Sequence, residues 1–194
     1  MADEIYFVNK FIYFQERNKE DYFYNSLIYI FEHDQNGALG VVVNKMIPIK
    51  ETKIFETLDL PANDDNKHLL NGGPVDVNKL FVIHDQNDIE SSLTVENGLN
   101  LTTDMDIIKT IGNGFFKGNY KLALGYCGWS SGQLDYEISR NNWLVVNTDP
   151  KVIFENKPKD LITIISKQVG YDIDKIQNSE IITKPVSYTH LRAH

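Results

Sequence analysis

One short polar corner of the sequence contains the residue types of a catalytic serine site. Residues 128–132, with the sequence GWSSG, match the G-x-S-x-G pattern in which a hydrolase nucleophile lies between a strand and a helix. Such a nucleophile needs a histidine base and an acid nearby. After Ser130 the histidines are His190 and His194, at the far end of the chain. We therefore interpret the corner as a tight turn, although a histidine earlier in the chain could also serve as the base.

The same corner has the spacing of a helix cap. Ser130 and Gln133 form an S-x-x-Q pair, which is typical of a capping box. The pattern predicts that the Ser130 hydroxyl accepts from the Gln133 N–H and that the Gln133 side chain returns to the Ser130 backbone. Asp135 and Glu137 would then lie near the positive end of the helix dipole. A cap of this kind contributes about 1 kcal/mol to stability.

Histidine and aspartate side chains follow two apolar runs and could form a second kind of site. His33 and Asp34 end one run, and His84 and Asp85 end another. A histidine beside a carboxylate can act as a general base, and such residues also bind metals. However, no H-x-x-x-H, H-E-x-x-H or paired-cysteine spacing is present, so we predict no metal site. An aspartate at a hairpin end usually bonds its own backbone.

Other residues near these strand ends could complete a ligand pocket. Gly72 and Gly73 precede a proline, where backbone N–H groups could hold an anion, although a turn that enters a strand is the simpler interpretation. Trp129 is expected to cover the core or to line a pocket through its indole N–H. Cys127 is interpreted as a small core residue rather than a reactive thiol. No residue is assigned a catalytic, cofactor or metal role, and the candidate pocket consists of His33, Asp34, Asn44, Gly72, Gly73, His84, Trp129 and Gln133.

Hairpins and short helices must position these residues. Asn-Gly pairs at 36–37 and 97–98 predict two antiparallel hairpins, the first with a type I′ turn. Thr103 is expected to be the N-cap of a short helix that ends near Gly112. This order of elements predicts an α+β fold around a curved, largely antiparallel sheet. Strands are expected over 5–14, 26–33, 38–44, 79–85, 121–126 and 143–147, and further helices over 52–60, 133–141 and 159–169.

The whole chain limits the classes of function. Its 194 residues are 42% hydrophobic, which suits one domain over residues 1–185. The formal net charge of −8 disfavours direct nucleic-acid binding, although a local basic patch stays possible. The single cysteine, the absence of a signal sequence and the absence of a long apolar run predict a soluble cytoplasmic protein. Residues 186–194 are expected to be a non-native or disordered tail.

Three segments in order carry a more specific pattern. They are residues 26–45 (SLIYIFEHDQNGALGVVVNK), 71–85 (NGGPVDVNKLFVIHD) and 122–138 (LALGYCGWSSGQLDYEI). Together they resemble the AlgH/YqgE family of bacterial proteins, whose corner pattern G-W-x-x-G-Q-L leaves the serine positions open. The resemblance implies an α+β fold with a bifurcated sheet curled into a partial barrel and flanked by helices. It implies no established reaction, although some members carry the name of a transcriptional regulator.

Two functional hypotheses follow. The first, which we favour, is a non-enzymatic regulatory or binding module that acts through a protein or small-ligand partner, without direct contact to nucleic acid or membrane. The alternative is a small-pocket, hydrolase-like enzyme that uses His33 or His84 with Asp34 or Asp85. Convergence of the candidate residues on one cleft would favour the enzyme, and their dispersal would count against it.

Overall fold

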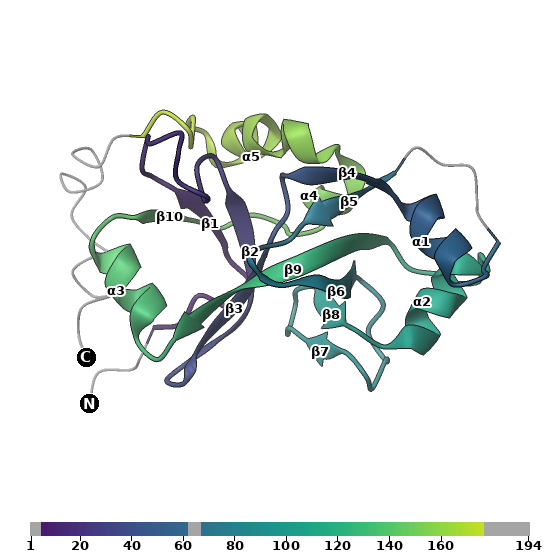
Figure 1. Cartoon of the computed structure of the whole chain (residues 1–194). Coiled ribbons are helices and arrows are strands. Elements are labelled where there is room, and N and C mark those ends of the chain that lie inside the picture. The colour runs from purple at the N-terminus through teal and green to yellow at the C-terminus, as the bar shows by residue number, and fades with distance from the viewer. Residues whose placement is uncertain (1–4, 62–66, 177–194) are drawn as a thin grey trace.

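The structure, a computed structural model, describes residues 5–61 and 67–176 (Figure 1). The helices of this part are α1 (Glu51–Thr57), α2 (Met105–Gly112), α3 (Gln133–Ser139), α4 (Val152–Glu155), the 3-10 helix η1 (Pro158–Asp160) and α5 (Leu161–Val169). The strands are β1 (Phe11–Phe14), β2 (Leu27–Asp34), β3 (Gly37–Val42), β4 (Met46–Lys50), β5 (His68–Asn71), β6 (Val75–His84), β7 (Leu93–Thr94), β8 (Asn100–Thr102), β9 (Tyr120–Ser130) and β10 (Trp143–Val146).

The strands form one branched sheet. Along its main path the order is β10-β1-β2-β3-β9-β6-β8-β7, and β5 joins β9 from the side while also pairing with β4. All pairs are antiparallel except β5 with β9. The predicted α+β class with a bifurcated, largely antiparallel sheet is confirmed, and the sheet stays open rather than closing into a barrel.

The long strand β9 is the point at which the sheet divides. Its second half pairs with β3, whereas its first half pairs with β6 and, at Ala123 and Leu124, with β5. Between the two halves Gly125 has a φ of 77°, a conformation that side-chain-bearing residues rarely adopt. A Cβ at Gly125 would also collide with the Gly73 carbonyl oxygen. The Gly72–Gly73 turn therefore lies directly against β9 at the branch.

Three apolar clusters hold the helices against the sheet. Successive buried residues of β1 and β2 face opposite sides, so one face packs on α4 and α5 and the other on α3. At the other end, α1 and α2 pack on β5 and β9 through Phe55 and Ile108. Figure 1 shows α3 near one end of the molecule and α1 with α2 near the opposite end. The near-continuous apolarity of residues 27–31 reflects this coverage on both faces.

Several predicted elements differ in detail. The strand expected over 5–14 is wrong before Phe11, because Asn9 has a φ of 64° and a turn interrupts the chain. The first hairpin is confirmed, but its type I′ turn is wrong: Asp34 pairs with Gly37, and the positive φ (141°) falls on Gly37 rather than within the two-residue loop. The N-cap of α2 is Asp104, which accepts from the Asp106 N–H, and not Thr103.

The remaining expectations separate into confirmed, missed and untested ones. The second hairpin, β7–β8, is confirmed, as is the central strand predicted over 121–126 within β9. The sequence interpretation missed β4, β5 and α4. The expected tail, residues 186–194, lies outside the described residues. No helix in the described part of the chain has the length and apolarity needed to cross a membrane.

Candidate functional site

The serine corner lies between β9 and α3. The Ser130 N–H donates to Gln133 Oε1 at 3.0 Å, so the predicted return bond of the glutamine is present. The serine cap is wrong, because α3 begins at Gln133 and its N-cap is Gly132, which makes no side-chain cap bond and has a φ of 73°. The Ser130 hydroxyl instead donates to Gln133 Oε1 at 3.3 Å.

Strand geometry separates Ser130 from the nearest candidate base. Ser130 of β9 and Asp34 of β2 both pair with Gly37 of β3. His33 and Trp129 both pair with the next residue of β3, Ala38. Because neighbouring residues of a strand point to opposite faces, the side chains of Ser130 and His33 leave opposite sides of the sheet. His33 is therefore not placed to take a proton from Ser130.

His33 is buried beneath α3 and is 5% exposed. Its Nδ1 accepts from the Phe7 N–H at 2.9 Å. Its Nε2 lies 3.2 and 3.3 Å from the two carboxylate oxygens of Asp135. The neutral ring therefore carries its proton on Nε2 and donates it to Asp135. The expected neighbour Asp34 has another role, since it accepts from the Asn36 N–H within the hairpin turn.

His84 lies in a second, separate environment and is fully buried. Its Nε2 is 2.8 Å from the Ser92 hydroxyl, and its Nδ1 accepts from the Gln86 N–H. Burial lowers the pKa of His84 below its ordinary value, although the charge of Asp85 opposes this shift. Asp85 itself accepts from the backbone and side-chain N–H groups of Asn119. The histidine is thus held neutral within a structural network.

The other candidate residues also have local roles. Asn44 accepts from the Leu27 N–H and donates to the Asn25 carbonyl, while the Trp129 indole donates to Glu137 at 2.8 Å. Trp129 and Gln133 share Glu137 as a partner, whereas His33, Asp34, Asn44 and His84 have other partners, and none of the eight candidates lines the pocket described below. Their assignment as one site stays a prediction. Within residues 5–61 and 67–176, no group of three or more His, Cys, Asp or Glu side chains is arranged to hold a metal.

Cys127 faces the interior beside the branch. It is 1% exposed, and its thiol donates to the Gly72 carbonyl at 3.5 Å. Burial raises the pKa of Cys127 to about 12. Because the thiolate is the reactive form, this cysteine is a core residue and not a nucleophile.

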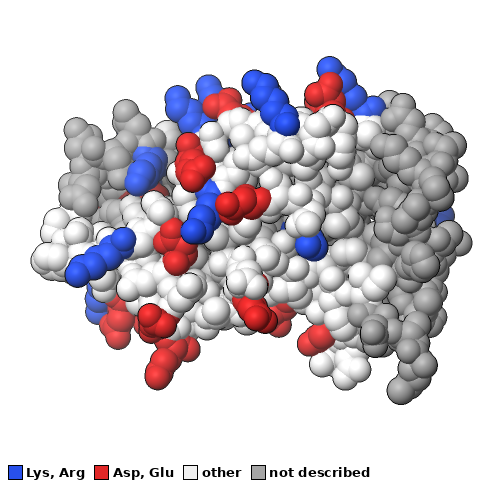
Figure 2. All heavy atoms as spheres, turned by 180° about the vertical axis from the view of Figure 1, so that it is seen from behind, with Lys and Arg blue, Asp and Glu red and all other residues white. Residues whose placement is uncertain are grey.

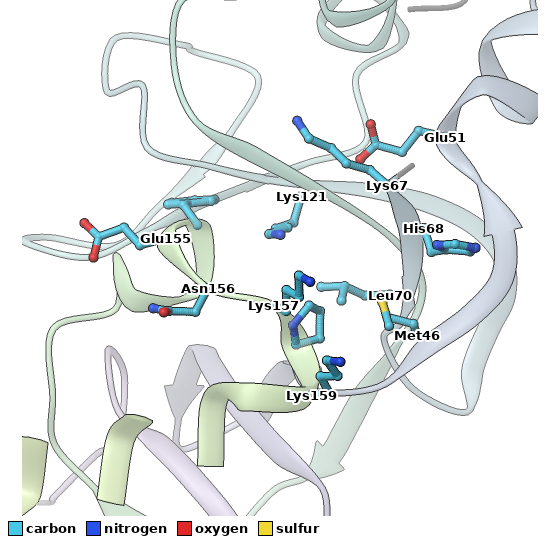
Figure 3. A pocket seen from close by; sticks show the side chains of 12 residues that line it. Met46, Glu51, Lys67, His68, Leu70, Lys121, Glu155, Asn156, Lys157 and Lys159 are labelled. Atoms are coloured by element: carbon cyan, nitrogen blue, oxygen red, sulfur yellow. The ribbon is translucent and has the colours of Figure 1, made fainter. Parts of the chain in front are cut away.

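A different set of residues lines a pocket of about 500 Å³ beside the branch of the sheet (Figure 3). Pockets for small ligands commonly occupy about 300–1,000 Å³. One wall comes from β4, the start of α1, β5 with the residue before it, and β9, and the other comes from α4, η1 and the residues that join them. We call this feature the lysine pocket; its lining residues are Met46, Glu51, Lys67, His68, Leu70, Lys121, Phe154, Glu155, Asn156, Lys157, Pro158 and Lys159.

Strand alternation explains how a lysine enters this pocket. Lys121 is two residues from Ala123 on β9, so both side chains share one face of the sheet. Ala123 pairs with Leu70 of β5 on that face, and both belong to the cluster that packs on α4 and α5. Lys121 therefore continues an apolar row and is half-buried where the row meets the pocket. On the opposite wall, Lys157 and Lys159 flank Pro158 at the start of η1.

The electrostatics of the lysine pocket favour negative charge. Burial, and then the charge of Lys67, lower the pKa of Lys121, while Glu51 opposes the shift. Glu51 is only 1% exposed, and its carboxylate accepts from the Tyr120 hydroxyl at 2.9 Å. The Lys67 ammonium also lies 5.0 Å from the centre of the Tyr120 ring. An anion placed beside Lys121 would relieve the repulsion between the two lysines.

Sequence reasoning missed this pocket, although two signals pointed to it. Lys121 lies on the apolar face of a strand that was predicted to be buried, and a charged residue on such a face is unusual. The second signal is the sequence Lys157-Pro158-Lys159, in which a rigid residue separates two cations. Neither signal indicates which other segments complete the pocket.

Comparisons with known proteins agree along most of the chain. The AlgH-like family model matches residues 11–174. A UPF0301 protein of Cupriavidus metallidurans is 36% identical over 172 residues, which cover 87% of this chain and 90% of the relative. A UPF0301 protein of Vibrio vulnificus is 37% identical over 155 residues, which cover 76% of this chain and 83% of that protein.

Solved structures show the same architecture. The solution structure of the AlgH protein from Pseudomonas aeruginosa matches with a TM-score of 0.75 and 26% identity, covering 96% of this chain and 98% of that one. The crystal structure of protein DIP2367 from Corynebacterium diphtheriae matches with a TM-score of 0.64 and 18% identity. The match covers 84% of this chain and 89% of that one. The second match supports the fold alone.

Fold and pocket together define an α+β protein with a branched, open sheet and a ligand-sized pocket beside the branch. Within that class, the chain belongs to the AlgH-like family, because the family model covers residues 11–174 and relatives at 36–37% identity align along most of their length. The resemblance drawn from the three sequence segments is thereby confirmed.

Proposed function

We propose that this protein is a non-enzymatic binding module that holds a small anionic ligand in the lysine pocket. The observation that carries the proposal is the composition of the pocket, which has four lysines against two glutamates in a volume of about 500 Å³. Lys121 is the central residue, because it is half-buried and because burial and the neighbouring Lys67 lower its pKa.

The charge of the whole chain makes this concentration of cations informative. The protein carries a formal net charge of −8, yet the lysine pocket has an excess of positive side chains. On the face shown in Figure 2, basic side chains gather along the upper edge with a few acidic ones among them, whereas both signs mix in the middle and acidic side chains predominate along the lower edge. Figure 1 places α4, α5 and β4 on that upper side. Such a local field raises the concentration of anions at the pocket mouth.

Any regulatory role follows from ligand binding and is indirect. The negative net charge does not suit direct contact with nucleic acid. The bound and free forms would instead be distinguished by a partner protein. We place this activity in the cytoplasm, where a reduced, buried Cys127 is expected.

A thermal-shift screen of small anions tests the proposal. An anion present at about 100 times its Kd should add about 2.7 kcal/mol to stability and raise the melting temperature. Lys121→Met keeps the apolar stem but removes the charge, so it should abolish the shift. The matched control is Lys53→Met, an exposed lysine of α1 outside the pocket, which should retain it. If no anion stabilises the protein, or if both variants respond like the original chain, the proposal fails.

A further inference from the structure

The lysine pocket has an excess of two positive charges. Its lining contains four lysines and two glutamates, with His68 counted as neutral. Figure 3 shows Lys121 and Lys157 reaching toward the middle of the pocket, while Glu155 points away from them. Glu51 is engaged by the Tyr120 hydroxyl. A ligand with a single negative charge would therefore leave part of this positive charge unbalanced.

The number and arrangement of the cations favour one kind of anion. All four are lysines, whose compact ammonium groups act as point charges from several directions. Arginine matches carboxylate and phosphate groups alike with two parallel hydrogen bonds, whereas lysine binds a phosphate as a point charge that needs no particular orientation. Lys121 and Lys157 approach from opposite walls, as ligands of a tetrahedral group would. The charge and its arrangement both suit a phosphate that carries two negative charges.

Apolar side chains form the remainder of the lining. Met46, Leu70, Phe154 and Pro158 contribute carbon surface from both walls. Leu70 and Pro158 are buried, while Met46 is 47% exposed at the rim. A volume of about 500 Å³ far exceeds what a bare phosphate fills. The ligand therefore needs an apolar body attached to its anionic group.

We infer that the natural ligand is a phosphate monoester with an apolar or aromatic body, in which Lys121 and Lys157 hold the phosphate and Leu70 and Phe154 contact the body. This inference rests on the proposed anion-binding function and adds the chemical class of the ligand. A monoester carries a charge of about −1.5 to −2 at pH 7, which matches the excess of two positive charges. The loss of repulsion at Lys121 adds to the affinity.

Three simple compounds test the inference by titration calorimetry at pH 7.5. Phenyl phosphate has both the dianion and the apolar body, methyl phenyl phosphate keeps the body with one charge, and inorganic phosphate lacks the body. Phenyl phosphate should bind at least about tenfold more tightly than either of the others, which corresponds to about 1.4 kcal/mol. Lys157→Met should remove most of this preference, whereas Lys151→Met, an exposed lysine outside the pocket, should retain it.

The outcomes separate the ligand class from the general function. Equal binding of phenyl phosphate and its methyl ester would overturn the dianion requirement, and equal binding of inorganic phosphate would overturn the apolar body. If none of the three binds but a carboxylate from the thermal-shift screen does, the phosphate class is wrong while anion binding stands. If no anion of any class binds, the inference and the proposed function both fail.

Discussion

His84 shows how a buried side chain can resemble a catalytic one. It follows an apolar run and precedes an aspartate, yet both of its ring nitrogens are engaged, by Ser92 and by the Gln86 N–H. Its surroundings exclude water, and burial lowers its pKa. Because its pKa differs between the folded and unfolded states, such a histidine makes the free energy of unfolding depend on pH. The role of His84 can therefore be tested by measuring how the free energy of unfolding changes with pH.

Acidification should destabilise the protein partly through His84. The unfolded chain takes up a proton near the ordinary pKa of 6.5, whereas the folded protein keeps His84 neutral to lower pH. Between these two pKa values the unfolded state binds more protons, so the free energy of unfolding falls as the pH falls. His84→Asn should reduce this pH dependence in urea-unfolding measurements between pH 7 and 5, although it lowers stability at pH 7. A slope unchanged in His84→Asn would mean that other groups account for the acid sensitivity.

The start of α3 depends on the backbone conformation of Gly132. Its φ of 73° lies in the left-handed region, and a Cβ there would meet nothing within 4 Å. Gly132→Ala therefore adds backbone strain but no steric clash. We expect the free energy of unfolding measured in urea to fall by about 1 kcal/mol, with an unchanged m-value. Gly128→Ala is the control, since its Cβ would only touch Tyr126 at 3.4 Å and should change stability by less than about 0.5 kcal/mol. Equal losses in the two variants would contradict this account.

The elements most accessible from sequence were those with strong local signals. The hairpin around residues 36–37, the buried strand 121–126 and the helix closed by Gly170 follow from turn residues and apolar runs. β4 was missed because its alternating pattern is short and contains Pro48. The capping box at the serine corner was misplaced because the S-x-x-Q spacing does not reveal that β9 extends to Ser130.

At the scale of the whole molecule, the branch at β9 creates the lysine pocket. Residues far apart in sequence meet there, from Met46 of β4 to Lys159 of η1. Family membership and the α+β class were predictable because three ordered segments carry them. The pocket was not predictable, since it depends on β5 joining β9 in parallel and on α4, an element without a clear sequence signal. The predicted candidates instead occupy strand ends with their own bonding partners.

Chemical-shift mapping of the ¹⁵N-labelled protein tests the central claim most directly. The protein is titrated with inorganic phosphate, and sodium chloride at equal ionic strength serves as the control. The account predicts saturable shifts at the backbone amides of Leu70, Lys121 and Lys157, which are lost in Lys121→Met. Saturable shifts confined to the corner around His33 and Gln133, or the same shifts with chloride, would contradict the assignment of the lysine pocket as an anion site.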